Sequence, residues 1–115
     1  MLAVIFEVTP REGQSQAYLQ TAAALRHRLE RIEGFISIER FQSLAEPNRL
    51  LSLSFWRDEA AIAEWRNLEA HRQAQRAGRE RIFEDYRLRI AEVVRDYGMT
   101  ERAQAPEDSR REHAG

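Results

Sequence analysis

The chain contains no cysteine and no lysine, and only three prolines and five glycines occur among its 115 residues. The absence of cysteine excludes disulfide bonds, thiol catalysis and cysteine-ligated metals. The absence of lysine makes all 18 basic residues arginines, which a biased genome composition explains more simply than recognition of carboxylates or phosphates. The formal net charge is −1, so bulk electrostatics argue against a nucleic-acid or anionic-membrane partner.

Long hydrophobic runs are also absent. The apolar start of the chain is interrupted at Glu7 and has no basic flank, so it is too short for a membrane span and unlike a signal peptide. We therefore expect a cytoplasmic protein. Hydrophobic residues make up 43% and charged residues 32% of the chain, which is the ordinary composition of one soluble domain.

Four segments have the alternation and composition of β-strands, and helical periodicity fills two of the intervals between them. From Tyr18 to Ile32, apolar residues recur every three or four positions, which predicts a helix of about 18 residues that begins near Ser15. A second helix follows Asp58, a residue type that caps helix N-termini. The order βαββαβ predicts an α+β, ferredoxin-like fold with an antiparallel sheet. The predicted strands are 2–8, 35–44, 49–56 and 86–94.

A homodimer is expected from the number of apolar sheet faces. Two helices can cover only one face of a four-stranded sheet, yet the strands carry apolar residues for both faces. In residues 49–56, for example, large apolar side chains alternate with two serines and Trp56. An uncovered apolar sheet face is an interaction surface, and a second copy of the chain would cover it most economically.

Several stretches together resemble one known family, the antibiotic biosynthesis monooxygenase (ABM) domains. The similarity rests on "GFISIERF", "LLSLSFWRDEAAIAEWR", "HRQAQRAGR" and "DYRLRIAEVVRDY". This resemblance implies a dimeric α+β barrel, with an ABM-like domain at residues 1–97. Residues 98–115 are polar and without periodicity, which predicts a C-terminal tail.

Trp65 and His71 are the predicted catalytic pair. The resemblance places Trp65 in a pocket, where an indole offers a flat wall for stacking and one N–H donor. Six positions on an unbroken helix turn through about 240°, so the two side chains would not share a face. We therefore predict a helix break between Trp65 and Ala70. The alternatives are that Trp65 belongs only to the core and that His71 is a solvated surface residue.

Glu7 is the third predicted catalytic residue, because a buried carboxylate in an apolar strand has a raised pKa and could accept a phenolic proton. The alternative is that Glu7 lies at a solvent-exposed strand end or forms an ion pair with an arginine. Asn67 is expected to end one helical segment and cap the next, and Arg87 to hold an anionic oxygen unless it faces outward. The predicted substrate-binding residues are Trp56, Asn67, Tyr86 and Arg87.

The resemblance implies a cofactor-independent monooxygenase that acts on an aromatic phenol or quinol with molecular oxygen. The chain departs from the quinone-forming members, which carry tyrosine at the position of His71 and asparagine at that of Ala61. The heme-degrading members carry an asparagine in the first strand, and residues 2–8 contain none. No spacing of ligands predicts a metal site, and no glycine-rich loop predicts a flavin or nicotinamide. The alternatives are a heme-binding or heme-degrading monooxygenase, with His71 as iron ligand, and a non-catalytic dimeric binding protein of the same fold.

Overall fold

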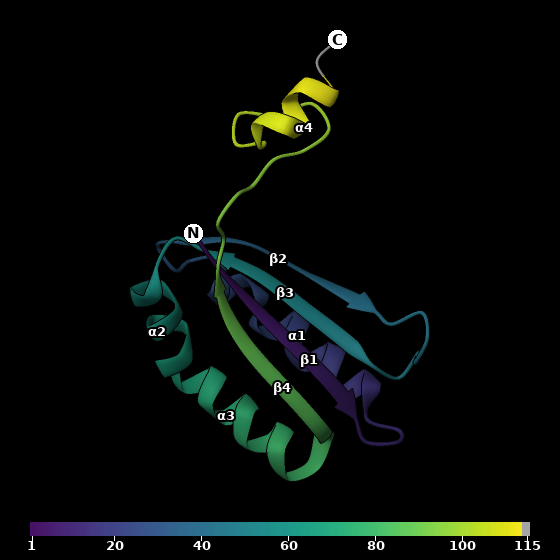
Figure 1. Ribbon diagram of the computed structural model, residues 1–115. Helices are drawn as coiled ribbons and strands as arrows, with labels where there is room; N and C mark the ends of the chain where they lie inside the picture. The colour runs from purple at the N-terminus through teal and green to yellow at the C-terminus, as the bar shows by residue number, and fades with distance from the viewer. Residues whose placement is uncertain (114–115) are drawn as a thin grey trace.

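The computed structural model describes residues 1–113, except for the side chains of residues 69 and 70. A four-stranded sheet packs against three helices, a short π-helical turn leads into the last strand, and a small helix lies near the C-terminus (Figure 1). In chain order the elements are β1 (Leu2–Pro10), α1 (Ser15–Leu29), β2 (Phe35–Gln42), β3 (Leu50–Trp56), α2 (Glu59–Asn67), α3 (Glu69–Ala77), the π-helical turn (Gly78–Ile82), β4 (Phe83–Glu92) and α4 (Glu107–Glu112).

The sheet has the order β2-β3-β1-β4, and every neighbouring pair is antiparallel. This arrangement confirms the predicted α+β, ferredoxin-like fold. The predicted bounds need correction at several ends. β4 starts at Phe83 and ends at Glu92, and β2 ends at Gln42. Helix α1 has 15 residues, and its N-cap is Gln14 rather than Ser15, without a side-chain hydrogen bond.

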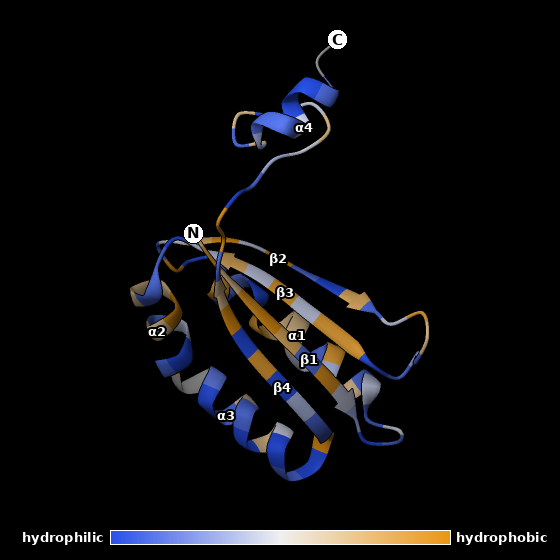
Figure 2. Ribbon diagram, in the orientation of Figure 1, coloured by the Kyte–Doolittle hydropathy of each residue, from blue (hydrophilic) through white to orange (hydrophobic). Residues whose placement is uncertain are grey.

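Each strand presents one set of alternate residues to the helices and the other set to an open face. On β1, Val4 and Phe6 lie beneath the helices, while Ile5 and Glu7 belong to the other set. Figure 2 shows the corresponding alternation of hydrophobic and hydrophilic residues along β4. Helices α1, α2 and α3 all contribute to one cavity on the same face, and no helix in the described part of the chain covers the opposite face of the sheet (Figure 1).

Trp56 is the centre of the hydrophobic core. Only 1% of its surface is exposed, and it packs with Leu29, Ile32 and Ile62. Its Nε1–H donates a hydrogen bond of 2.9 Å to Ser54 Oγ, which satisfies the one polar group of the buried indole. The end of β3 is thereby anchored to α1 through Leu29 and to α2 through Ile62.

The second helical region is broken at Leu68, as predicted. Helix α2 ends at Asn67 and α3 begins at Glu69, because Leu68 has an extended backbone with φ −64° and ψ 133°. The predicted cap at the start of α2 is also confirmed, since Asp58 Oδ1 accepts a hydrogen bond of 3.0 Å from the Ala61 N–H. That hydrogen bond is the largest cause of the lowered pKa of the Asp58 carboxyl, and a hydrogen bond from Arg57 is the second largest.

Beyond β4 the chain leaves the sheet and forms a small structure of its own (Figure 1). Arg102 donates to Ser109 Oγ at 2.6 Å, and Ala105 is buried among these local contacts. Helix α4 is hydrophilic along its length (Figure 2). None of the helices in the described part of the chain is both long and apolar enough to cross a bilayer.

Candidate functional site

A cavity of about 360 Å³ lies between the sheet and helices α1, α2 and α3. Its walls are mostly apolar, and its size falls within the usual range of small-molecule sites. The side chains of Tyr86, Leu88 and Ile90 on β4 also line it and remain partly exposed, so this edge strand borders the opening. The sheet contributes Val4, Phe6, Ile38, Arg40, Ser52, Ser54 and Trp56, and the helices contribute Tyr18, Leu25, Ile62, Trp65, His71 and Ala74 among others.

Trp65 and His71 stack on each other in the wall of this cavity. Their ring centroids are 4.3 Å apart, and their planes differ by 18°. The break at Leu68 makes this possible, because residues six positions apart on a continuous helix would point in different directions. The structure therefore brings together the two residues that were predicted to face one cavity.

The backbone of α2 determines which nitrogen of His71 carries the proton. His71 Nδ1 lies 3.0 Å from the Trp65 carbonyl oxygen, which can only accept a hydrogen bond. Nδ1 is therefore the donor, and in the neutral ring Nε2 is left as a free acceptor. No protein group in the described part of the chain bonds to Nε2.

Burial keeps His71 in its neutral form. Desolvation lowers the pKa of the imidazole below its usual value of 6.5, and the hydrogen bond to the Trp65 carbonyl opposes this shift only in part. A half-buried, neutral imidazole with an unoccupied Nε2 is chemically a general base at neutral pH. This property is what the arrangement of Trp65 and His71 can contribute to a reaction.

Asn67 braces the helix break instead of lining the cavity. Its Nδ2 donates to the Ala63 carbonyl at 2.8 Å, and its Oδ1 accepts from Arg72 in the next helix. The expectation that Asn67 caps the second segment is wrong, because the N-cap of α3 is Leu68 and no side chain caps it. Asn67 is exposed and absent from the cavity wall, so the structure gives it a positioning role and not a substrate contact.

Trp56 and Tyr86, two of the predicted substrate-binding residues, do line the cavity. Trp56 lies in its floor at the end of β3. Tyr86 lies at the opening on β4, where its hydroxyl accepts a hydrogen bond of 2.9 Å from Arg79. Tyr86 also packs against Phe6 and Phe83, with ring centroids 5.6 and 5.7 Å apart, so it belongs to an aromatic cluster as well as to the site.

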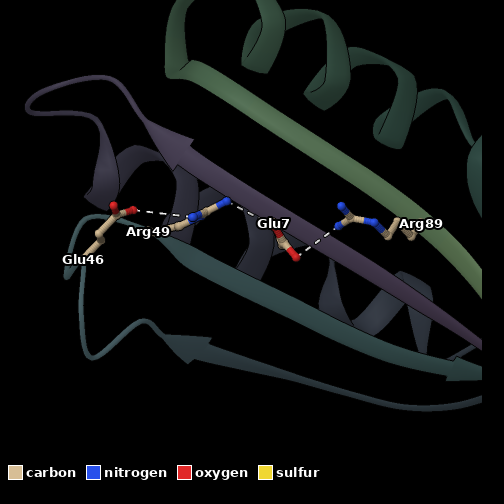
Figure 3. Close-up of polar contacts among 4 residues, drawn as sticks. All are labelled: Glu7, Glu46, Arg49 and Arg89. Atoms are coloured by element: carbon tan, nitrogen blue, oxygen red, sulfur yellow. Dashed lines mark hydrogen bonds and ion pairs between the residues drawn. The ribbon is translucent and has the colours of Figure 1, made fainter.

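Glu7 and Arg87 lie on the opposite side of the sheet and do not reach the cavity. The two residues are paired across β1 and β4, and both belong to the set of alternate residues that faces away from the helices. Glu7 forms ion pairs with Arg89 at 3.1 Å and Arg49 at 3.3 Å (Figure 3). The expectation of a catalytic Glu7 therefore fails on geometry, and the alternative of a carboxylate paired with arginine is what the structure shows.

The cavity also contains polar residues that the sequence did not single out. Ser52 and Ser54 are both buried, and Arg40 lies beside Ser52 across the β2–β3 ladder. The available signal was the alternation in β2, because Arg40 shares its strand face with Ile38, which also lines the cavity. Among the side chains that the structure describes, no three His, Asp or Glu residues gather in an arrangement that could hold a metal ion.

The protein is an α+β, ferredoxin-like module whose cavity beneath the helices has the size of a small-molecule site. The sequence model of the antibiotic biosynthesis monooxygenase family matches residues 1–77. The chain belongs to the antibiotic biosynthesis monooxygenase family.

Two relatives extend this assignment. A protein of Pyricularia oryzae named jasmonate monooxygenase ABM is 47% identical over 94 residues, which are 82% of this chain but only 44% of that protein. The uncharacterized protein YqjZ of Bacillus subtilis is 32% identical over 94 residues, which are 81% of this chain and 79% of that protein. The present chain thus spans less than half of the first relative and most of the second.

Solved structures share the fold at much lower sequence identity. A Mycobacterium tuberculosis protein has a TM-score of 0.75 at 16% identity, and the similarity covers 84% of this chain and 98% of that one. A structure named antibiotic biosynthesis monooxygenase has a TM-score of 0.70 at 16% identity, with 82% and 99% covered. At such identities the similarity shows the fold alone.

Proposed function

We propose that the protein is a cofactor-independent monooxygenase that oxidises an aromatic phenol or quinol with molecular oxygen. The observation that carries this proposal is the Trp65–His71 stack, which places a neutral imidazole with a free Nε2 in an apolar cavity. Family membership supports monooxygenase chemistry, and the cavity supports a small, flat, largely apolar substrate.

In the proposed reaction of a phenol that carries hydrogen at its para carbon, His71 Nε2 takes the proton of the phenolic hydroxyl. The resulting phenolate is electron-rich enough to give an electron to oxygen, and the two radicals combine at the para carbon to form a peroxide. Loss of the para C–H proton then breaks the O–O bond. One oxygen atom stays on the ring as a new carbonyl, the other leaves as water, and all four electrons come from the substrate. A quinol carries a hydroxyl at the para carbon, so it instead gives two electrons and two protons to oxygen and yields its quinone and hydrogen peroxide. Neither route requires a flavin or metal.

The protein groups orient the substrate and exclude water from it. Trp65 supplies a flat surface next to the base, and its indole N–H has no partner within the described residues, so it can donate to a substrate oxygen. The apolar walls exclude water from the phenolate and its radical. Asn67 acts indirectly. Its hydrogen bonds to Ala63 in α2 and Arg72 in α3 stabilise the helix break, and the break orients His71.

Oxygen consumption with menadiol and with a naphthol tests the proposal. We expect uptake above the uncatalysed rate and, with labelled oxygen, one labelled atom in the quinone formed from the naphthol. Replacing His71 by Gln should lower kcat by about 100-fold or more, the usual contribution of a general base. The matched control is His27→Gln, since His27 is an exposed histidine of α1 that does not line the cavity. Full activity in His71→Gln would refute the assigned role.

Jasmonate is a second candidate substrate, because the 47% identical relative is named for it. Hydroxylation of a saturated carbon differs from phenol oxidation in its electron balance. One oxygen atom enters the substrate and the other becomes water, but two electrons must come from an added reductant such as NADH. Oxygen uptake with jasmonate that occurs only in the presence of a reductant would favour this candidate over the phenol.

Two other functions for the same cavity are separated by a hemin titration. A shifted Soret band with one hemin per chain, abolished by His71→Ala, would indicate a heme-binding monooxygenase. No heme signal and no oxygen uptake would indicate a non-catalytic binding protein.

We also propose that the chain forms a homodimer through the open face of the sheet. Ile5, Leu51, Leu53 and Phe55 belong to the strand residues of that face, which no helix covers. An obligate interface of this kind buries about 2,000 Å² or more. Light scattering should therefore give twice the 13.5 kDa mass of the chain, and a monomer at micromolar concentration would contradict the proposal.

A further inference from the structure

The charged side chains around the cavity are all of one sign. Four arginines line it, namely Arg26, Arg40, Arg66 and Arg79, and no described Asp or Glu side chain does. The chain as a whole has a net charge of −1, so the cavity is positive although the protein is not. A low-dielectric cavity with charges of one sign concentrates ligands of the opposite sign.

Two of these arginines already have partners. Arg26 Nε is 3.0 Å from Glu30 on the same helix, and Arg79 donates to the hydroxyl of Tyr86 at 2.9 Å. Arg40 differs from both. Its Nε is buried, and neither a hydrogen-bond partner of this atom nor an ion pair to Arg40 is found among the side chains that the structure describes. A buried donor of a charged group without a partner is costly, and a bound anion would remove that cost.

Ser52 completes a site for an anionic oxygen. It pairs with Arg40 across the β2–β3 ladder, lines the same cavity and is only 7% exposed. Its hydroxyl forms no hydrogen bond with another described group. An arginine beside a hydroxyl matches the geometry of a carboxylate, which accepts several hydrogen bonds in one plane.

Arg40 and Tyr86 line the cavity from opposite edges of the sheet. Arg40 is on β2, at one edge of the sheet, and Tyr86 is on β4, at the other. The two strands are three strand spacings apart, which is about 14 Å. A ligand that contacts both Arg40 and the β4 side of the cavity must therefore extend across the width of the sheet.

We propose that the ligand of this cavity is a small apolar acid whose carboxylate binds Arg40 and Ser52. Its apolar body lies along the cavity, so that the end remote from the carboxylate can meet Trp65 and His71. This inference rests on the proposed function, since the same cavity holds the molecule that is oxidised. It adds that the substrate is a hydroxyaryl acid, anchored at one end and deprotonated at the other.

The test compares 6-hydroxy-2-naphthoate with its methyl ester by isothermal titration calorimetry on the full chain at pH 7. The two compounds have the same rings and the same remote hydroxyl, and they differ in the negative charge. We expect the acid to bind at least tenfold more tightly than the ester. In Arg40→Gln the acid should weaken by at least tenfold, which is 1.4 kcal/mol, while the affinity of the ester stays the same.

Arg87→Gln is the matched control, because Arg87 is a strand arginine on the opposite face of the sheet. It should keep the wild-type preference for the acid. The proposal is overturned if wild type binds acid and ester equally, if neither compound binds, or if Arg40→Gln weakens both to the same extent. An equal effect of Arg87→Gln would also overturn it, since bulk charge would then explain the preference.

The wild-type comparison needs no variant and stands even if Arg40→Gln fails to fold. Arg40→Lys is the second variant, and it should bind the acid more weakly than wild type, because lysine keeps the charge without the planar fork of donors. Binding is measured apart from turnover. Oxygen uptake with simple naphthols but no preference for the acid would leave the proposed function standing and refute this inference alone.

Discussion

The substitution Gly34→Ala tests whether the close contact between Gly34 and helix α2 positions the site. Gly34 precedes β2 and has a φ of +95°, in the region that side-chain-bearing residues rarely adopt. A Cβ on Gly34 would lie 2.9 Å from the Cβ of Ala61, which is closer than such atoms pack. Ala61 is four residues before Trp65 on α2, so this close approach sets where the helix and its tryptophan lie against the sheet.

Gly13 provides the matched comparison. Its φ is +79°, but a Cβ at this position would meet no atom within 4 Å. An alanine in the left-handed region costs roughly 1–2 kcal/mol at either position. At Gly34 the crowding against Ala61 adds roughly 1–3 kcal/mol. The gain of about 0.4–1 kcal/mol from a stiffer unfolded chain is common to both and cancels in the comparison.

Thermal and urea unfolding followed by circular dichroism would measure the difference at equal protomer concentration. For a domain of this size, 1 kcal/mol corresponds to about 4 °C, so Gly34→Ala should melt about 4–12 °C below Gly13→Ala. Adding Ala61→Gly to Gly34→Ala should recover a coupling of about 1–3 kcal/mol in a double-mutant cycle. Equal melting temperatures for the two single variants would refute the steric argument.

Four further predictions concern the site and the tail. In an NMR titration, the midpoint of His71 should lie below 6.5, and the neutral ring should be the Nδ1–H tautomer. An Nε2–H tautomer would contradict the assigned base. Because the pKa of His71 is lowered in the folded protein, the unfolded chain binds a proton at His71 first as the pH falls. The stability due to His71 should therefore be complete above pH 6.5 and be lost as pH falls through the folded-state pKa. This loss should be absent in His71→Gln. Hemin should bind weakly or not at all, and a tight one-to-one complex that depends on His71 would reverse the ranking of the two enzyme functions. Deletion of residues 99–115 should leave the melting temperature nearly unchanged, whereas a large fall would show that the tail is part of the fold.

Local chemistry was enough to predict the elements and their order. The alternation of residues 49–56 marks a strand in any surroundings, and Asp58 caps α2 through its own backbone neighbours. The helix break was predictable for a different reason. Only a break between Trp65 and Ala70 lets Trp65 and His71 face one cavity, and Leu68 supplies it.

The sequence alone did not predict which face of each strand lies beneath the helices. A period of two separates Glu7 from Phe6 and Arg40 from Glu39, but it does not say which set lies beneath the helices. In β3 the small set, Ser52 and Ser54, faces the cavity and leaves room for it, while the large apolar set faces the open side. The packing of the helices decides which face of the sheet is covered, and this packing depends on contacts between residues far apart in the chain. The same choice places Glu7 among arginines on the open face and leaves Arg40 in the cavity without a partner.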